Sequence, residues 1–408
     1  MTQNNRRQKV LDNRNYIVSN IPNYDPKPGY DIIKAATYRD IGVIRLLSGH
    51  EAFHVINYQD VKKILMDKNC LRSPSNEEGA PSILPTLTPK DMLLNLDFPD
   101  HTRLKQFISK DYSLSGLRWL EPVIIELTEK YADEIAKKNQ ADLFSDLLDH
   151  IASETNCTLL GIPLEDQNYF RTLSHIVQIA DPSDVEELVR QFELLYRYVM
   201  DHVQGKRLHT SDGLIAKFLQ NRANCQPPLS DEELTAILLG ALLGGDQNTL
   251  TVMTKIVYGL LCMPNLWQKL HDEPALIPVT IEEMLRLTNL GNASTFPRIA
   301  NQEIRLTTGT IPAGAAIYAD VILANRDPDV YAEPLRINPY REGNRHLQFG
   351  YGMHNCMGQE LVRLEMNTVV SILTHKFPQM RLCQDKLHHL RWCEGIVLRR
   401  PDELPVVL

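Results

Sequence analysis

The chain has 408 residues, of which 43% are apolar and 23% are charged, so it can bury a large core as a globular protein. Its net charge of −8, without a Lys/Arg cluster beyond an ordinary solvated face, argues against nucleic acid as a partner. The polar N-terminus has no apolar signal region, and the longest apolar run, 236–245, is too short to span a bilayer. We therefore predict a cytoplasmic protein without a membrane anchor.

Domain organisation and cysteine usage also follow from composition. Length alone suggests two or three domains, but no long Gly/Ser/Pro linker divides the chain. We predict one domain over residues 1–408, with about the first 30 residues peripheral. The seven cysteines are scattered and contain no C-x-x-C pair, so neither a disulfide framework nor a zinc or iron–sulfur site is indicated. Most of them are predicted to be core residues.

The first regular elements form a small β region in a mostly helical chain. Residues 42–47 and 52–56 are predicted to form two strands joined by a turn at 48–50. A helix is predicted directly after them, from Tyr58 to Met66.

A long loop precedes the first polar residues of interest. From Arg72 to Pro89 the sequence is rich in Ser, Pro, Asn and Gly, and such a loop in a compact protein is usually functional or mobile. A helix is then predicted to open at Pro99 and to carry His101 and Lys105, four residues apart, on one face. On spacing alone, a solvated basic face is the commoner explanation of this pair.

Between 113 and 223 the pattern predicts helix after helix. The series is broken at 161–163 and at 181–182, and a capping box at Ser183 and Glu186 begins its longest member. No residue of this stretch is predicted to be catalytic.

A second capping box, at Ser230 and Glu233, begins an almost wholly apolar helix that is predicted to cross the interior. In its middle the sequence turns polar, as G-G-D-Q-N-T at 244–249. The two glycines cost helix stability, and the amides would be buried unless something uses them. Structural hydrogen bonding is the commoner explanation of such an interruption, and a functional site is the alternative.

The most informative segment is R-H-L-Q-F-G-Y-G-M-H-N-C-M-G, from Arg345 to Gly358. Its cysteine, Cys356, stands just before an amphipathic helix that begins near Gln359, where free N–H groups and the helix dipole favour a thiolate. Three glycines would let the backbone turn sharply and a flat cofactor lie close to it: Gly350, Gly352 and Gly358. A lone cysteine is otherwise most often a small buried hydrophobe.

The pattern F-G-x-G-x-H-x-C-x-G in this segment resembles the haem-ligand loop of the cytochrome P450 family. The matches H-T-R-L-K at 101–105 and A-N-R-D-P at 324–328 extend the resemblance over roughly residues 30 to 400. The resemblance implies that Cys356 is the axial thiolate to the iron of haem b. It also implies the P450 fold, mainly α with a smaller β region, with haem between a long central helix and the Cys-ligand loop.

The resemblance implies a set of haem contacts. In the family, the first and last positions of H-T-R-x-R bind the haem propionates, which assigns that role to His101 and Lys105. Lysine in place of the usual arginine keeps the charge but loses the bidentate fork. Arg298 matches the family's propionate-binding arginine, and His354 is implied as a fourth partner of the propionates. The remaining implied contacts to the cofactor are Phe349, Gly350 and Gly358.

A structural ion-pair network is implied as well. Glu283 and Arg286 form an E-x-x-R pair, which is a weak signal by itself because i,i+3 ion pairs are common. By its distance from the cysteine it matches the family's network, and Arg336 in P-L-R-I is implied as the third member.

The polar interruption of the central helix aligns with the family's oxygen-binding kink, usually Gly-x-acid-Thr. Here Gln247 stands at the acid position and Asn248 at the alcohol position. A shift of one residue, which would make Asp246 the acid, stays open as an alternative. These three are the candidate catalytic residues, and the family's substrate contacts imply a pocket lined by Leu243, Gly244, Ser294 and Ile396. The family also places its pocket roof at 72–89 and its lid helices within 113–223.

The resemblance implies a monooxygenase that inserts one oxygen atom from O2 into a hydrophobic small molecule, by hydroxylation or epoxidation, in secondary-metabolite biosynthesis. The chain has neither a G-x-G-x-x-G on a strand nor an iron–sulfur cysteine set, so electrons must come from separate proteins such as a ferredoxin and its reductase. A monomer is expected. The alternatives are a haem enzyme of oxidative coupling, desaturation or peroxide-driven oxidation, and a non-enzymatic haem-based sensor.

Overall fold

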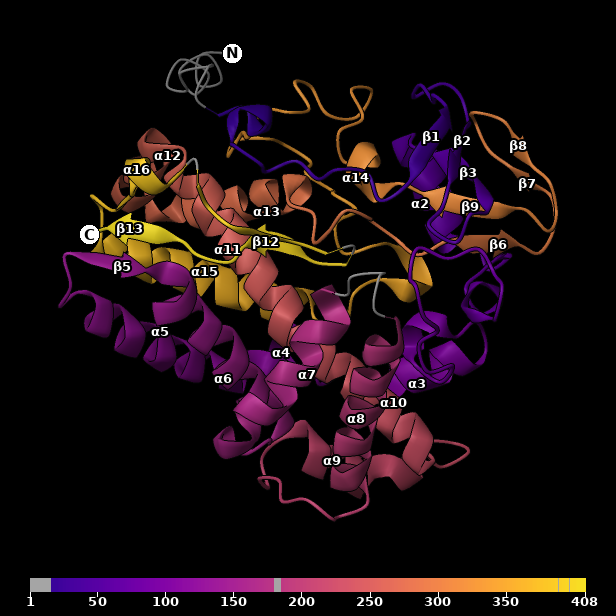
Figure 1. The fold of residues 1–408 in the computed structure, drawn as a ribbon, viewed down its shortest axis with the longest axis horizontal. Helices are drawn as coiled ribbons and strands as arrows, with labels where there is room; N and C mark the ends of the chain where they lie inside the picture. Colours follow the sequence, from indigo (N-terminus) through magenta and orange to yellow (C-terminus); the bar gives the residue numbers. More distant parts are fainter. Residues whose placement is uncertain (1–15, 180–184, 388, 396) are drawn as a thin grey trace.

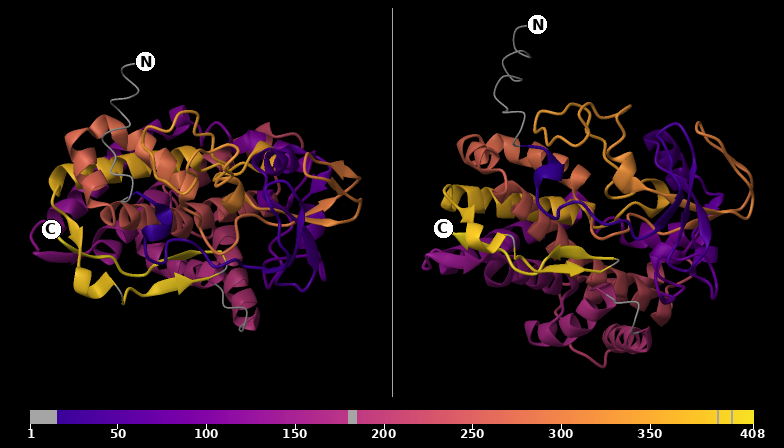
Figure 2. Two further views of the ribbon diagram at one scale, coloured as in Figure 1. Left: turned by 90° about the horizontal axis from the view of Figure 1, so that it is seen from above. Right: turned by 45° about the horizontal axis from the view of Figure 1, so that its top comes forward.

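The computed structural model describes residues 16–179, 185–387, 389–395 and 397–408. Helices are the predominant regular structure, and the strands of the largest sheet gather at one end with helix α2 (Figure 1). Two further views show the same separation (Figure 2). The predicted fold class, mainly α with a smaller β region, is confirmed.

The largest sheet has six strands in the order β1-β2-β3-β9-β6-β4. All neighbours are antiparallel except β3 and β9, so the early hairpin is joined to strands from far along the chain. The two predicted strands are confirmed as β2 and β3. The bounds are β1 Asp31–Lys34, β2 Gly42–Arg45, β3 Glu51–Val55, β4 Cys70–Leu71, β6 Arg298–Ala300 and β9 Ala316–Ala319.

Helix α2 spans Tyr58–Met66, as predicted. It begins there because the side chain of Asn57 accepts hydrogen bonds from the N–H groups of Gln59 and Asp60, two donors that have no partner inside the helix. Its apolar face packs Val61, Ile64 and Leu65 into the core beneath the sheet.

The helices before the centre of the chain also follow the predicted pattern. Helix α6 ends where Gly161 adopts φ +83°, which confirms the break at 161–163. The predicted capping residue Ser183 lies outside the described residues, and α8 begins at Val185. The bounds are α3 Asp100–Ile108, α4 Leu114–Leu117, α5 Glu121–Ile135, α6 Asp149–Leu160, α7 Gln167–Ile179, α8 Val185–Val203 and α9 Leu214–Asn221.

The central helix is interrupted by a wider turn. Helix α10, Asp231–Leu243, starts with the predicted capping box of Ser230 and Glu233. A π turn, η8, covers Gly244–Asn248, and α11 continues over Thr249–Leu261 with every residue buried. The predicted kink is therefore confirmed, and the helix crosses the interior.

The remaining elements complete the core and its edges. Helix α15, Gln359–Lys376, packs against α5 and α13. The other helices are α12 Pro264–Asp272, α13 Ile277–Leu287, α14 Val321–Ala324 and α16 Gln384–Leu387. The smaller sheets contain β5 Gln140–Asp142, β7 Ile304–Arg305, β8 Thr310–Ile311, β10 Arg381–Leu382, β11 Trp392–Glu394, β12 Arg399–Pro401 and β13 Pro405–Val407.

No single helix of the described residues is long and apolar enough to cross a membrane. One pair of helices, 231–261 with 264–272, passes that test by length and composition only, and it is bent by 99°.

Candidate active site

Cys356 lies in a tight loop that ends at the start of α15. The N–H of Cys356 donates to the carbonyl of Phe349 (2.7 Å) and closes the loop. Gly350 has φ +70° and Gly352 has φ +73°, a conformation that residues with a Cβ rarely adopt. A Cβ on Gly352 would also stand 2.8 Å from the carbonyl oxygen of Leu65. The predicted need for glycine is confirmed at these two positions.

Gly358 has a different structural role. Its φ is −79°, and nothing lies within 4 Å of the position that a Cβ would take. This leaves open space beside Cys356, whose side chain is open to an internal cavity. Burial raises the pKa of the Cys356 thiol, whereas the N–H groups of Gly358 and Gln359 lower it. The predicted N–H groups are present, but burial of the thiol opposes their effect on its pKa. A bound metal ion would supply the positive charge that stabilises a thiolate.

The internal cavity has a volume of roughly 430 Å³. Its wall brings together side chains of α3, α10, η8, the start of α11, the segment 290–298 and the Cys356 loop. It is lined by these predicted site residues: His101, Lys105, Gly244, Asn248, Ser294, Arg298, Phe349, Gly350, His354, Cys356 and Gly358. Leu243, the last residue of α10, is partly buried against a hydrophobic cluster and is not among the described residues that line the cavity. Ile396 lies outside the described residues.

Three of the predicted propionate ligands lie together at the polar end of the cavity. The rings of His101 and His354 have centroids 4.5 Å apart. His354 donates from Nε2 to the carbonyl of Leu96 (2.7 Å), so its Nδ1 accepts from Nη1 of Arg298 (3.4 Å). Burial lowers the pKa of His101 to about 4 and the pKa of His354 to about 3, so both rings are neutral at pH 7. The histidines are therefore neutral hydrogen-bonding groups, and Arg298 carries the charge.

Lys105, the fourth predicted ligand, is turned toward the Cys356 loop. Its Nζ donates to the carbonyls of Met353 (2.6 Å) and Asn355 (3.0 Å), and to the side-chain oxygen of Asn355. An ammonium has three donors, and these bonds use all of them. His101 and Lys105 both reach the cavity from α3, as predicted, but Lys105 supports the loop in front of Cys356.

One further cationic residue at this end was missed by sequence reasoning. Arg72 follows β4, is 5% exposed and lines the cavity. Its guanidinium lies over the ring of Phe296, 4.9 Å from the centroid. In the sequence it is simply the first residue of a loop, and nothing in its neighbourhood indicates that the chain buries it.

Glycine at position 245 is required by the neighbouring helix α6. A Cβ on Gly245 would stand 2.2 Å from Oδ1 of Asn156. Nδ2 of Asn156 donates to the carbonyl of Leu242 (3.0 Å), in the last turn of α10. This bond satisfies a carbonyl at the place where the helix widens into the π turn, a distortion that is frequent at functional sites.

The three candidate catalytic residues of η8 point in different directions. Asn248 lines the cavity. Asp246 and Gln247 are buried, and neither is among the described residues that line it. Oδ1 of Asn248 is buried and has no hydrogen-bond partner within the described part of the chain. Successive helical residues point to different faces, so only one of the three can contact a group bound in the cavity. The geometry favours Asn248 and places the other two behind it.

Asp246 and Gln247 connect the kink to two other elements. Asp246 pairs with Nε of Arg171 on α7 (3.5 Å) and accepts hydrogen bonds from Ser174 (3.3 Å) and from the amide of Gln247 (3.2 Å). Burial raises the pKa of Asp246, and the charge of Arg171 opposes that shift. Oε1 of Gln247 accepts from Nη2 of Arg400 on β12 (3.1 Å). Both residues thus hold the kink to its surroundings.

Comparison with known proteins decides the family, because the family model described as Cytochrome P450 matches residues 14–402. This chain belongs to the cytochrome P450 family. It is 34% identical to the mycinamicin IV hydroxylase/epoxidase of Micromonospora griseorubida, over 88% of this chain and 90% of the relative. It is 31% identical to the nocardicin C N-oxygenase of Nocardia uniformis subsp. tsuyamanensis, over 97% and 98%. The solved structure of the mixed-function P450 MycG matches it at TM-score 0.82 and 32% identity, over 94% of this chain and 100% of that one.

As a cytochrome P450, the chain is a haem-thiolate monooxygenase that uses haem b, O2, a hydrophobic substrate and electrons from redox partners. The cavity fits this cofactor on its own residues. The Cys356 side chain and the space at Gly358 face it. Nδ1 of His101 is buried without a hydrogen-bond partner among the described residues, so it has a free position for a carboxylate or a water.

The predicted ion-pair network of this P450 is present with a different third member. Both carboxylate oxygens of Glu283 bind Arg286 at 2.9 Å, and Nε of Arg341 binds the same carboxylate at 2.9 Å. Arg336 instead pairs with Glu333 (2.8 Å) and contributes only its carbonyl oxygen, to Arg286 and Arg341. The prediction for Arg336 is wrong because the chain turns back after it and brings the arginine five residues later to Glu283.

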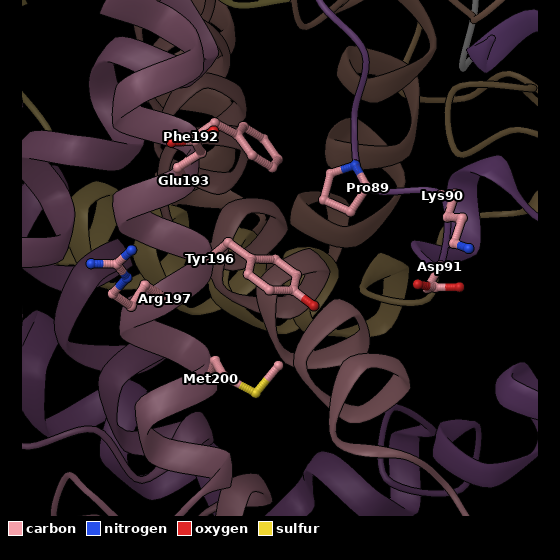
Figure 3. Close-up of a pocket in the computed structure, with 8 residues that line it drawn as sticks. All are labelled: Pro89, Lys90, Asp91, Phe192, Glu193, Tyr196, Arg197 and Met200. Atoms are coloured by element: carbon pink, nitrogen blue, oxygen red, sulfur yellow. The ribbon is translucent and has the colours of Figure 1, made fainter.

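The roof of the P450 cavity lies slightly later in the chain than predicted. Arg72 and the segment 92–94 line the cavity, and the residues between them lie outside its lining. An open groove of roughly 660 Å³ lies between residues 89–91 and helix α8 (Figure 3). Its lining residues are Pro89, Lys90, Asp91, Phe192, Glu193, Tyr196, Arg197 and Met200.

Proposed function

We propose that Cys356 ligates the haem iron and that Arg298, His101 and His354 bind the haem propionates. The observation that supports this most directly is that the Cys356 side chain, the three polar residues and Asn248 of the kink all line one cavity. Segments far apart in the chain meet at this cavity. They bring the Cys356 thiol to one part of its wall and buried hydrogen-bond donors to another. The chain is proposed to act as a single domain.

When bound, haem with a thiolate ligand activates dioxygen for insertion into carbon that ordinary acid–base chemistry cannot attack. The residues of this chain then position the substrate and exclude water. The apolar part of the cavity wall includes Met92, Ile237, Leu290 and Phe296, which favours a hydrophobic substrate.

Asn248 is proposed to orient the substrate or an ordered water. Its side chain carries both a donor and an acceptor, and Oδ1 has no partner among the described residues. Since an amide does not readily release or take up a proton, protons are proposed to travel through water or a substrate hydroxyl that Asn248 holds. Ser294 is proposed as a second contact, although its hydroxyl also bonds Asp320 (3.3 Å) and the N–H of Val321 (3.1 Å).

The substrate is proposed to be a bulky hydrophobic intermediate of secondary metabolism, oxidised by hydroxylation, epoxidation or heteroatom oxygenation. The support is that relatives of the chain are named for such reactions, including the mycinamicin IV hydroxylase/epoxidase, the nocardicin C N-oxygenase and a 20-oxo-5-O-mycaminosyltylactone 23-monooxygenase. A ferredoxin and its reductase are proposed as the electron donors, with the enzyme a cytoplasmic monomer. Oxidative coupling is the second candidate, because Asn248 replaces the usual alcohol and the putative thioether synthase SgvP matches the chain at TM-score 0.84.

Two measurements test the proposal. Titration of the reduced protein with carbon monoxide should give a thiolate-type band, which Cys356→Ser should abolish because an alcohol does not supply a thiolate ligand. Retention of that band in Cys356→Ser would overturn the ligand assignment. Candidate intermediates should then be screened for the spectral shift that follows displacement of an iron-bound water, and the positive ones incubated with ferredoxin, its reductase and NADPH. A product that gains one oxygen atom supports monooxygenation, and one that loses two hydrogens supports coupling or desaturation.

A further inference from the structure

We propose that Arg72 is a further cofactor-binding residue, whose guanidinium binds a carboxylate of the haem beside Arg298. It would take over the role that the family resemblance gives to the basic residue at position 105. The inference rests on the proposed placement of haem in this cavity, and it adds a residue to which neither the sequence pattern nor the comparisons assign a role.

The first observation is the orientation of Lys105. Its three ammonium donors end on the carbonyls of Met353 and Asn355 and on the Asn355 side chain, all in the loop just before Cys356. A carboxylate could be bound by Lys105 only if it gave up one of these bonds. The cation that position 105 normally offers to the cofactor is therefore already engaged in holding the loop.

The second observation is that Arg72 is a buried charge without an ionised partner. Its side chain donates to the carbonyls of Leu94 (3.0 Å) and Pro297 (2.6 Å), to the hydroxyl of Ser75 and, at 3.4 Å, to the side-chain oxygen of Asn95. All four acceptors are neutral. Arg72 has five N–H donors, so one is left over, and it belongs to Nη2, whose only hydrogen bond among the described residues is the long one.

The carboxylate of Asp97 does not neutralise this guanidinium directly. Its oxygens accept hydrogen bonds from the backbone N–H groups of Arg72 and Ser73 and from the Ser73 hydroxyl. Burial lowers the pKa of Arg72 to about 9, the nearby charge of Arg298 lowers it as well, and Asp97 only partly compensates. Two buried guanidinium groups that repel each other are costly unless an anion lies between them.

The third observation is the charge balance at the polar end of the cavity. Two guanidinium groups, those of Arg72 and Arg298, are among the described residues that line the cavity, and Arg298 donates to the carbonyl of Cys70 and to Nδ1 of His354. Arg72 and Arg298 therefore supply two positive charges to the two negative charges of the haem propionates. Charge-assisted hydrogen bonds of this type are the stronger ones in proteins, and guanidinium groups suit carboxylates geometrically.

A purely structural role for Arg72 makes a different prediction. Its bonds to Leu94 and Pro297 join the cavity roof to the segment before β6, so its removal could loosen the cavity without any contact to the haem. The two roles are separated by haem dimethyl ester, which has the same ring and iron but no carboxylates. A residue that binds a carboxylate distinguishes the two cofactors, and a residue that only shapes the cavity does not.

The experiment measures release of each cofactor from the reconstituted full-length protein into excess apomyoglobin. Arg72→Gln should release haem about tenfold to a hundredfold faster than the parent, as expected for loss of a hydrogen bond to a charged group, and should change release of the dimethyl ester little. Arg72→Lys should recover part of the difference, because it keeps the charge but loses the fork. Lys105→Gln is the matched control and should accelerate both cofactors by a similar factor, because it acts through the Cys356 loop.

Equal acceleration of haem and its ester by Arg72→Gln would overturn the inference and leave Arg72 as a structural residue. If Arg72→Gln does not take up haem, Arg72→Lys serves in its place with the propionate bending bands of the resonance Raman spectrum as the measurement. Bands that stay at the parental positions in Arg72→Lys would also overturn the inference. A thiolate-type carbon monoxide band in the same samples shows that the Cys356 assignment holds independently of either outcome.

Discussion

The side-chain oxygen of Gln247 accepts a hydrogen bond from Nη2 of Arg400, at 3.1 Å. Gln247 occupies the position at which the family usually has an acid, and Arg400 lies on β12, more than 150 residues later in the chain. Both side chains are buried, with exposures of 2% and 1%, and Nε of Arg400 has no partner within the described residues. The amide at the acid position therefore serves a buried cation and lies away from the cavity.

This pair predicts a measurable coupling. Gln247→Ala should lower the free energy of unfolding by about 1.5–3 kcal/mol, because it leaves a buried guanidinium donor without an acceptor. In an Arg400→Met background the same substitution should cost clearly less, since the donor is gone. Denaturant unfolding of the four haem-loaded proteins measures both values. Additive effects of the two substitutions would show that the hydrogen bond contributes nothing to stability.

Asn248 is expected to affect product pattern more than electron use. Asn248→Ala should keep much of the coupling between NADPH consumption and product, while changing the position on the substrate that is oxidised. Asn248→Thr should bring no large gain, because the neighbouring acid position still carries an amide. The measurements are hydrogen peroxide yield and product distribution with the substrate found by screening. If Asn248→Ala diverts nearly all electrons to peroxide while substrate binding is intact, Asn248 itself takes part in proton delivery.

The carboxylate of Glu283 is expected to be essential for folding with haem. Glu283→Ala leaves Arg286 and Arg341 buried without their shared anion and should cost about 3–5 kcal/mol of unfolding free energy. Arg341→Ala should be strongly destabilising as well. Arg336→Ala is the matched control and should cost well under half as much, because its partner Glu333 is largely exposed. Equal losses for Arg336→Ala and Arg341→Ala would contradict the network seen here.

Glu365 on α15 predicts a pH-dependent stability. Its side chain is fully buried, and neither carboxyl oxygen has a hydrogen-bond partner within the described part of the chain. Burial raises the pKa of Glu365 well above its usual range, so the folded protein binds this proton more tightly than the unfolded chain. Its stabilising effect is complete below the ordinary glutamate pKa and is lost as pH rises toward the folded value.

Glu365→Gln should remove this dependence. As pH rises above the ordinary glutamate pKa toward the raised pKa of the folded protein, the parent should lose about 1.4 kcal/mol of unfolding free energy per pH unit relative to the variant. Unfolding of the haem-loaded proteins between pH 5 and pH 8 measures the difference, and Glu360→Gln, a less buried carboxyl on the same helix, is the control. Parallel pH profiles for the parent and Glu365→Gln would mean that the group is ionised in the folded state.

The sequence was informative where local rules decide the structure. The helix of Tyr58–Met66, the capping box at Ser230 and the positive φ angles of Gly350 and Gly352 follow from hydrogen bonding and sterics among neighbouring residues. The positions of Cys356 and Asn248 within family motifs predicted functional roles for them, and both residues line the cavity.

Long-range partners could not be read in the same way. Arg341, Arg400 and Arg72 owe their roles to chain turns and strand pairings that carry no local signal, and each is held by residues remote in sequence. The orientation of Lys105 was likewise undetermined, because helical spacing fixes the face of a residue and not the end point of a flexible four-carbon side chain.

The bonds from Lys105 to the Cys356 loop connect two functions of the molecule. The segment that roofs the cavity at 92–94 runs directly into α3, and α3 carries the ammonium that binds Asn355, next to Cys356. Roof and thiol are thus joined by one short stretch of chain and a set of hydrogen bonds. Residues 92–105 therefore shape the roof of the cavity at one end and hold the cysteine loop at the other, so a change in this stretch should affect both.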